Sequence, residues 1–206
     1  DPEFFIQMIN YFVDHHQVNK DRIFATGFSN GGQMIYRLGL EIPQQFSALA
    51  VIAANLPIAE NLDCHKSERP ISIAIFNGSD DPINPYHGGL VDIFGDNSRG
   101  NVLSTAATVN YWAELNHLER QNEITLPKTD HNTDTSIVKT TWRANDNRTG
   151  NKTTINNKQV RLYRLQGSGH VIPSKVVDFA KILGANAMDI EAAEEIWSFF
   201  KATENH

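Results

Sequence analysis

One pentapeptide near the start of the chain constrains the fold more than any other segment. Residues 27–31 are Gly-Phe-Ser-Asn-Gly, a G-x-S-x-G pattern with Ser29 at its centre. The pattern follows a short apolar run at residues 22–26, which predicts a strand, and precedes a helical pattern at residues 33–40. This context predicts a sharp strand-to-helix turn with Ser29 as a candidate nucleophile. The pentapeptide alone is also compatible with an ordinary glycine-rich turn.

The residues around Ser29 suit such a turn. A nucleophile there adopts strained backbone angles, and small neighbours let strand and helix approach closely, which is the role expected for Gly27, Gly31 and Gly32. The turn also places Ser29 at a helix N-terminus, where free N–H groups and the helix dipole favour developing negative charge. The backbone N–H of Asn30 is therefore the candidate oxyanion donor.

Apolar patterning along the rest of the chain predicts alternating strands and helices. Further strands are expected at residues 48–54, 71–76, 137–142 and 160–165, and helices at residues 2–16, 102–118 and 189–201. The first two of these strands are rich in Ile, Ala and Val, which is typical of neighbouring buried strands in a parallel sheet. The whole chain is expected to be a single α/β domain, a mostly parallel sheet flanked by helices. Functional residues of such sheets lie on loops at the carboxyl ends of the strands.

The terminal helices and two polar segments complete this picture. The first helix carries a wide apolar stripe and is expected to pack against a large surface, and Trp197 on the stripe of the last helix is expected to be in the core. Residues 127–135 are expected to form a surface loop. Residues 144–151 are expected to connect two strands as a long hairpin; a calcium site there is the less favoured alternative to a solvated turn.

A candidate acid follows the strand expected at residues 71–76. Residues 77–82 are Asn-Gly-Ser-Asp-Asp-Pro, which offers Asp80 and Asp81. A carboxylate at this place could orient an imidazole and stabilise the imidazolium that forms during proton transfer. Taken alone, the segment is better explained as a turn, because Asp-Pro and Gly-Ser pairs are common in loops.

A candidate base follows the strand expected at residues 160–165. Residues 167–170 are Gly-Ser-Gly-His, so a glycine loop presents His170 at the same sheet edge. An imidazole titrates near neutral pH and can take the serine proton, although a lone loop histidine is more often a surface residue. The chain order Ser29, acid, His170 is that of the α/β-hydrolases, and each residue follows a predicted strand. The ordered trio predicts a catalytic triad.

The other histidines do not fit the role of the base. His15 and His16 end a helix, His117 lies near another, and the following lack a G-x-G-H loop: His65, His87, His131 and His206. His87 is a candidate substrate-binding residue because it follows the acid loop closely. Adjacent histidines point apart on a helix, so no catalytic metal is predicted, and nothing implies a cofactor.

Composition excludes several other classes of function. The 206 residues are 40% hydrophobic with a formal net charge of −6 and no basic stripe, so nucleic acid is not an expected partner. No apolar run approaches the roughly 20 residues that span a bilayer, and the first residues lack the pattern of a signal peptide, so no membrane partner is expected. Cys64 is the only cysteine, so no intrachain disulfide can form.

The combined segments resemble the polyhydroxybutyrate depolymerase-like and feruloyl esterase-like carboxylesterases of the α/β-hydrolase superfamily. The similarity covers that family's nucleophile segment, acid loop, histidine loop and closing segment, at residues 21–32, 77–82, 167–170, and 183–190 with 195–200. The resemblance implies ester hydrolysis by Ser29, Asp81 and His170. It also favours Asp81 over Asp80, because Asp81 precedes Pro82 as in that family.

The sequence departs from the family at several positions. Val-Ile-Pro-Ser follows His170 where the family often has Thr, Trp, Pro and Gly, which bears on substrate preference. Asn77 stands where the family often has His, and residues 116–118 replace a segment that often carries a cysteine. Arguments from disulfides about export therefore do not transfer to this chain.

The largest departure concerns what precedes the first helix. The family places several strands, and the loop that donates the second oxyanion N–H, before that helix. Without them the strand at residues 22–26 would be an uncovered edge and the helix would lack much of its partner. We therefore expect residues 1–206 to be the C-terminal part of a longer hydrolase domain.

These observations predict a serine carboxylic-ester hydrolase acting through an acyl-enzyme on a short-chain hydroxyacyl, acetyl or aromatic ester, as a small molecule or a polyester. Two alternatives stay open: a serine peptidase of the prolyl oligopeptidase type, which the segment after His170 argues against, and a hydrolase-fold domain without turnover. A homo-oligomer or pairing with the missing N-terminal segment is left open. The cellular compartment is also left open, and only the family resemblance favours secretion or the periplasm.

Overall fold

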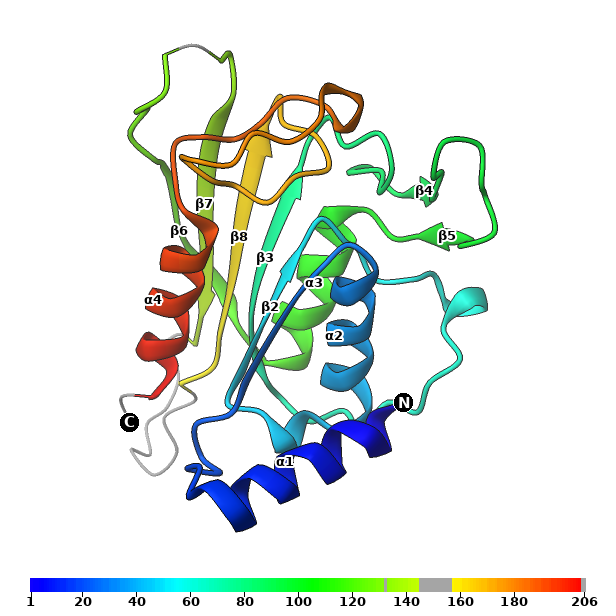
Figure 1. Ribbon diagram of the computed structural model, residues 1–206, viewed down its shortest axis with the longest axis vertical. Helices are drawn as coiled ribbons and strands as arrows, with labels where there is room; N and C mark the ends of the chain where they lie inside the picture. The colour runs from blue at the N-terminus through cyan, green and yellow to red at the C-terminus, as the bar shows by residue number, and fades with distance from the viewer. Residues whose placement is uncertain (132, 145–156, 205–206) are drawn as a thin grey trace.

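A six-stranded sheet forms the centre of the computed structural model, which describes residues 1–131, 133–144 and 157–204 (Figure 1). The strands lie in the order β1-β2-β3-β8-β7-β6. The parallel strands are β1 (Phe24–Phe28), β2 (Ala48–Ile52), β3 (Ser72–Gly78) and β8 (Gln159–Gln166). The sheet continues antiparallel through β7 (Ser136–Arg143) and β6 (Glu119–Thr125). A separate antiparallel pair consists of β4 (Gly89–Leu90) and β5 (Asn101–Val102).

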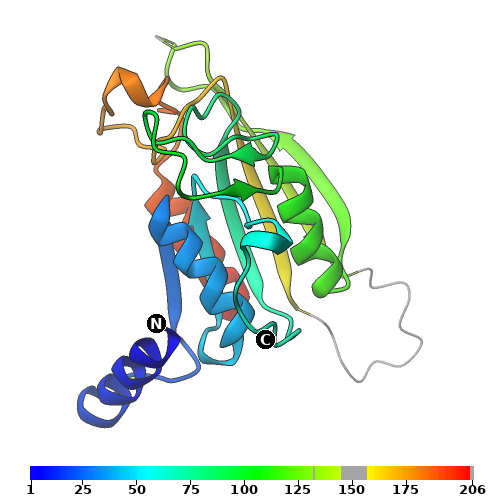
Figure 2. The same ribbon diagram turned by 90° about the vertical axis from the view of Figure 1, so that its right-hand side faces the viewer.

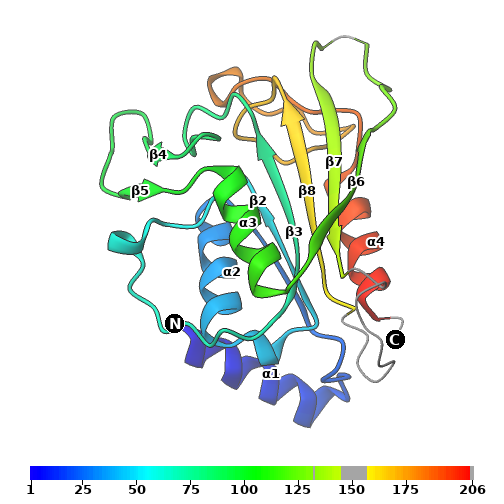
Figure 3. The ribbon, with the colours of Figure 1, turned by 180° about the vertical axis from the view of Figure 1, so that it is seen from behind.

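Helices cover both faces of this sheet. Two of them, α2 (Asn30–Glu41) and α3 (Thr105–Leu115), pack on one face, and α4 (Ala192–Glu204) packs on the other, as the two opposite views show (Figures 1 and 3). The first helix, α1 (Pro2–His16), lies at the other end of the molecule from the loops that follow β3 and β8 (Figure 2). Short 3₁₀ turns occur at Pro43–Gln45, Ala59–Asn61 and Lys181–Leu183. The predicted α/β class, with helices flanking a mostly parallel sheet, is confirmed.

The strand β2 shows why the sequence is apolar at consecutive positions. Leu49 and Val51 pack in the cluster that contains Trp112 of α3, whereas Ala50 packs in the cluster that contains Phe199 of α4. Successive side chains of a strand point to opposite faces, so a strand covered on both sides needs apolar residues throughout. The expected pairing of β2 with β3 in one sheet is confirmed.

The strand β6 is the strand of the central sheet that the sequence did not predict; the short strands β4 and β5 were not predicted either. The seven residues of β6 are polar apart from Ile124, and nearly all are exposed at the edge of the sheet. An edge strand that faces water carries no alternating apolar signal, and charged side chains protect it from pairing with other chains. The preceding helix is shorter than predicted, because β5 takes its expected start and Asn116 caps its end by donating to the Trp112 carbonyl at 2.7 Å.

The predicted loops agree with the structure where they are described. Residues 127–131 and 133–135 lie outside the strands and helices, and β7 and β8 pair antiparallel as a hairpin requires. The calcium alternative concerned residues 144–151, which, apart from Ala144, lie outside the described residues. Among the residues described, no helix is long and apolar enough to cross a membrane.

In the described part of the chain, the first helix is largely exposed and the first strand is an edge strand of the sheet. Only Ile9 of α1 is buried, and the exposed apolar side chains of the helix are Phe4, Met8, Tyr11 and Phe12. Within the described residues, the helix therefore lacks the large packing surface that its apolar stripe predicts. At the sheet, β1 has β2 as its neighbour on one side and no described strand on the other.

The prediction that Trp197 is a core residue is also wrong. Its side chain is 49% exposed, and its ring meets the Phe24 ring of β1 edge-on at 6.4 Å. The apolar stripe of α4 is wider than the part of the helix that faces the sheet. Phe199 and Phe200 fill the buried contact, and Trp197 lies beyond it, beside the uncovered edge.

We expect Phe199→Ala and Trp197→Ala to differ strongly in their effect on the free energy of unfolding. Phe199 is fully buried, so its truncation should cost about 3–5 kcal/mol, whereas Trp197→Ala should cost less than about half of that. Urea denaturation of both variants and the parent measures the difference. Equal losses would mean that Trp197 is part of the core after all.

Candidate active site

Three loops at one end of the parallel strands bring Ser29, Asp81 and His170 together. The loops follow β1, β3 and β8, whose carboxyl ends lie at the same end of the sheet. Ser29 Oγ lies 2.8 Å from His170 Nε2, and His170 Nδ1 lies 2.7 Å from Asp81 Oδ2. The structure thus joins the three sequence-predicted residues in one chain of hydrogen bonds. Such a chain lets a serine give its proton to an imidazole that a carboxylate orients.

Ser29 occupies the strained turn that the pentapeptide predicts. Its backbone angles are φ 54° and ψ −118°. A residue other than glycine adopts this region of backbone angles at a cost of about 1–3 kcal/mol. The Ser29 N–H donates to the Ile52 carbonyl at 2.9 Å, and the Ser29 carbonyl accepts from the Gln33 N–H at 3.1 Å. The residue is therefore bound to β2 on one side and to the first turn of α2 on the other.

The glycines beside this turn have different roles. A Cβ on Gly27 would lie 2.3 Å from the Gly31 carbonyl oxygen, and one on Gly32 would lie 2.9 Å from the Ala54 Cβ. These two glycines allow the close approach of strand and helix that the sequence predicts. Gly31 does not, because a Cβ there would meet nothing within 4 Å. The prediction of a spatial role for its missing side chain is wrong.

Asp81, and not its neighbour Asp80, is built into the site. The Asp81 side chain is 1% exposed; its Oδ1 accepts from the backbone N–H groups of Ile83 and Asn84, both at 2.8 Å, which leaves Oδ2 for His170. Asp80 is exposed and accepts from the Ser79 hydroxyl. A buried carboxylate needs such donors to offset its lost hydration.

The closing segment of the chain holds the histidine loop in place. The Gly169 N–H donates to the Ala185 carbonyl at 3.0 Å, and the His170 N–H donates to the Leu183 carbonyl at 2.7 Å. A Cβ on Gly169 would lie 1.9 Å from the Leu183 carbonyl oxygen, so only glycine allows this approach. The His170 ring also lies 5.0 Å from the Phe28 ring, centre to centre.

Asn77 is a positioning residue that the sequence singled out only as a departure from the family. Its buried amide nitrogen donates to the Ala54 carbonyl, to Asn55 Oδ1 at 2.8 Å and to Thr105 Oγ1 at 3.0 Å. The Ala54 N–H donates back to Asn77 Oδ1 at 3.2 Å. One side chain at the end of β3 therefore joins the loop after β2 to the start of α3. A polar residue ending a buried strand was the only signal for this role.

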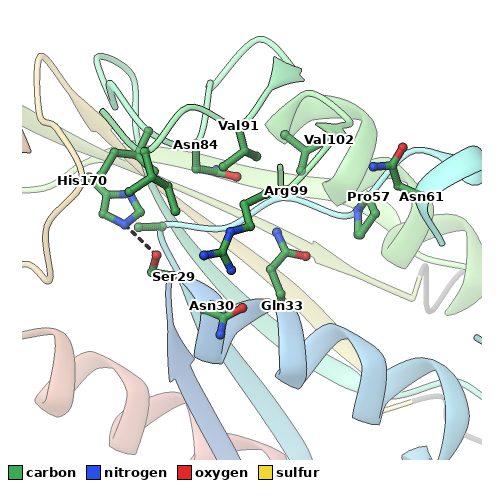
Figure 4. A pocket seen from close by; sticks show the side chains of 13 residues that line it. Ser29, Asn30, Gln33, Pro57, Asn61, Asn84, Val91, Arg99, Val102 and His170 are labelled. Atoms are coloured by element: carbon green, nitrogen blue, oxygen red, sulfur yellow. Dashed lines mark hydrogen bonds between the residues drawn. The ribbon is translucent and has the colours of Figure 1, made fainter. Parts of the chain in front are cut away.

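A cavity of about 260 Å³ opens beside the serine (Figure 4). Ser29 and His170 line it together with apolar and with polar side chains, which are Ala53, Pro57, Ile83, Val91, Ile93 and Val102, and Asn30, Gln33, Asn61, Asn84 and Arg99. Sequence patterns gave no sign of Gln33, Asn84 or Arg99. They come from separate loops and a helix, and only the fold brings them to one place.

Two other predicted site residues take different places. Asn30 is the first residue of α2, where backbone N–H groups have no partner within the helix, and its side chain lines the cavity. His87 is exposed, with its ring against the Tyr86 ring at 5.3 Å, and it is not among the residues that line the cavity. The structure does not bring His87 to Ser29, because the loop after the acid turns its side chain outward.

Metal binding and a cysteine nucleophile are two alternatives that the described residues do not support. These residues contain no group of three or more His, Cys, Asp or Glu side chains that could hold a metal ion. Cys64 is partly buried, and burial is the main cause that raises the pKa of its thiol, so it lacks the thiolate character of a nucleophile.

Comparisons with known proteins agree with this architecture. A family model described as phospholipase/carboxylesterase matches residues 3–91. NocK of Nocardia uniformis subsp. tsuyamanensis, an esterase by name, is 32% identical over 90 residues, which are 43% of this chain and 25% of NocK. Probable feruloyl esterase C of Aspergillus niger is 33% identical over 73 residues, 35% of this chain and 26% of that protein. The matched segment thus spans about a quarter of each relative.

A solved structure matches over a longer range. Acetyl xylan esterase from Aspergillus awamori superposes with a TM-score of 0.59 at 13% identity, over 98% of this chain and 67% of that chain. At this identity the likeness is one of fold. The sheet order, the turn at Ser29 and this likeness define an α/β-hydrolase fold. The matching family model and the esterase relatives, each of which covers less than half of this chain, are similar to it in sequence and agree with that fold.

We expect Gly27→Ala and Gly31→Ala to have opposite consequences for stability. Gly27→Ala forces a methyl group against the Gly31 carbonyl and should lower the free energy of unfolding by about 1–3 kcal/mol. Gly31→Ala adds a methyl group in open space within α2 and should be neutral or stabilise by up to about 1 kcal/mol. Chemical denaturation compares the two. A larger loss for Gly31→Ala would contradict the geometry described for the turn.

Proposed function

We propose that this chain carries the catalytic machinery of a serine carboxylic-ester hydrolase that works through an acyl-enzyme. The observation that carries the proposal is the chain of hydrogen bonds from Ser29 through His170 to Asp81, at 2.8 Å and 2.7 Å. The serine also lies at the N-terminus of α2, where negative charge on an attacked carbonyl oxygen is favoured. The esterase names of the relatives support the same reaction class.

The reaction would follow from the places of the three side chains. His170 Nε2 takes the proton of Ser29 Oγ as this oxygen attacks the ester carbon. Asp81 accepts the hydrogen bond of His170 Nδ1–H, which keeps the imidazole in the useful tautomer and stabilises the imidazolium. His170 then gives the proton to the leaving alcohol. A water molecule, activated by the same imidazole, releases the acid and restores Ser29.

The oxyanion hole would have two donors from different parts of the protein. The Asn30 N–H is the donor within this chain, and the second is proposed to come from a segment outside these 206 residues, as part of a longer hydrolase domain. The uncovered edge of β1 and the exposed apolar side chains of α1 support that proposal. Loss of one oxyanion donor costs about 10²–10³ in rate, so the isolated chain is expected to be slow.

The proposed substrate is an ester with a short hydroxyacyl, acetyl or aromatic acyl group, free or part of a polyester. Feruloyl and acetyl xylan esterases, by their names, act on aromatic and acetyl esters, and the sequence resembles depolymerase-like enzymes as well. The cavity beside Ser29 has apolar walls that suit such acyl groups. We extend the family resemblance to the proposal that the full protein is secreted or periplasmic.

The reaction class is tested by comparing a short-chain nitrophenyl ester with a prolyl nitroanilide. The parent chain should hydrolyse the ester and not the anilide, and Ser29→Ala should lower the ester rate at least about a thousandfold. Hydrolysis of the anilide alone would favour the peptidase alternative. Equal ester rates for Ser29→Ala and the parent would refute the proposal and favour a domain without turnover.

The identity of the acid is tested by a matched pair of neighbouring substitutions. Asp81→Asn should lower kcat by about 10⁴-fold, because the amide cannot hold His170 in the productive tautomer. Asp80→Asn should change kcat by less than about twofold, since Asp80 is exposed and contacts Ser79. Ester hydrolysis by both variants decides the matter. A larger loss of kcat for Asp80→Asn than for Asp81→Asn would show that Asp80, and not Asp81, is the acid.

A further inference from the structure

One side chain with a fixed charge reaches into the cavity beside Ser29. Among the described residues that line the cavity, Arg99 is the only Lys, Arg, Asp or Glu (Figure 4). Its side chain is 52% exposed, and its only described ion pair is with Asp96, at the long distance of 3.9 Å between Nη2 and Oδ2. A guanidinium has five N–H donors, so most of them are available to a ligand.

The backbone holds Arg99 at the cavity. Arg99 precedes Gly100, whose carbonyl accepts from the Val91 N–H at 3.0 Å, and this bond closes the base of the loop between β4 and β5. The Ser98 N–H donates to Asp96 Oδ1 at 3.0 Å, and the hydrogen bonds from Ser98, with a smaller contribution from the Arg99 cation, hold the pKa of the Asp96 carboxyl below its usual value. The Asp96 carboxylate therefore stays ionised, but at 3.9 Å from Arg99 Nη2 it forms no close ion pair with the guanidinium.

Two buried amide atoms that line the same cavity have no protein partner. Asn84 is 4% exposed; its Oδ1 accepts from the Asn55 N–H at 3.2 Å, and its Nδ2 has no described hydrogen bond. The Gln33 Nε2 donates to the Asn55 carbonyl at 2.9 Å, and its Oε1 is likewise unpaired. The Asn55 backbone fixes which way each amide faces. Buried polar atoms normally have a partner, so an unpaired donor and an unpaired acceptor mark this part of the cavity wall as polar.

We propose that this cavity selects esters that carry a carboxylate a few atoms from the scissile bond, with Arg99 binding the carboxylate. The inference rests on the proposed esterase function and names the substrate class of the same site. A guanidinium matches a carboxylate with two parallel hydrogen bonds, and no acidic side chain lining the described cavity opposes it. The apolar wall of Ile83, Val91 and Val102 would contact the carbon chain.

The specificity is tested with two pairs of esters that differ by one charge. Monomethyl adipate and dimethyl adipate place the charge on the acyl side; 6-acetoxyhexanoate and its methyl ester place it on the alcohol side. For at least one pair, the parent should show a higher kcat/KM per ester group for the anion. Arg99→Gln should lower this anion-to-neutral ratio roughly three- to tenfold, and 0.5 M salt should lower it in the parent.

Arg69→Gln is the matched control. Arg69 is an exposed arginine just before the amino end of β3, whereas the candidate site lies beyond the carboxyl end of that strand. Its replacement removes the same charge without changing the cavity. The anion-to-neutral ratio of Arg69→Gln should equal that of the parent. If Arg99→Gln keeps the parent's ratio for both pairs, or if Arg69→Gln lowers it equally, the assignment of Arg99 is overturned.

Binding without turnover separates this inference from the proposed function. The Ser29→Ala chain is titrated calorimetrically with monomethyl adipate and 6-acetoxyhexanoate and with their neutral partners, with and without Arg99→Gln. Tighter binding of an anion that is lost with Arg99→Gln supports the site even if the parent hydrolyses none of the esters, in which case the esterase proposal alone fails. Binding that does not depend on Arg99 overturns the inference even where neutral esters are hydrolysed.

Discussion

The backbone of Ser29 is the constraint on which the site depends. A positive φ at a residue with a side chain is unfavourable, and here it is held by hydrogen bonds to β2 and to α2. The turn needs Gly27, because strand and helix approach within a distance that excludes a Cβ. It gives Ser29 a half-buried hydroxyl at a helix N-terminus, within hydrogen-bond distance of His170 Nε2.

The remaining parts of the site are held by backbone contacts between strand ends. A Cβ on Gly78 would lie 2.3 Å from the Gly169 carbonyl oxygen, so the acid loop and the histidine loop touch through their main chains. The closing segment binds the His170 backbone from the other side, and Asn77 joins β3 to the loop after β2. Such contacts are less adjustable than side-chain packing, which is what a hydrogen-bond chain of fixed geometry requires.

Much of the fold was predictable from sequence, and the reasons for the failures are physical. Buried strands such as β2 and β3 are apolar on both faces, and the glycine motifs mark the strand ends, so Ser29, Asp81 and His170 could be predicted to share an edge. The polar edge strand β6 carries no such signal. Trp197 belongs to a helical stripe that is wider than the contact that buries it.

The walls of the cavity were beyond sequence reasoning for a different reason. Gln33, Asn84 and Arg99 meet only because a helix, the acid loop and the β4–β5 loop converge on Ser29. None of them belongs to a motif, and the unpaired amide atoms are a property of the folded chain. The turn that carries Ser29 is thus encoded locally, whereas the walls of the cavity beside it depend on the tertiary structure.

The proposed function requires Ser29 to be an activated nucleophile. The most direct measurement is the reaction of the folded chain with a fluorophosphonate, followed by mass spectrometry of its peptides. We expect one covalent adduct on Ser29, formed at least about a hundredfold more slowly in His170→Ala, where the base that activates the hydroxyl is absent. A folded chain that stays unlabelled at Ser29, or that labels as fast in His170→Ala as in the parent, would contradict the proposed function.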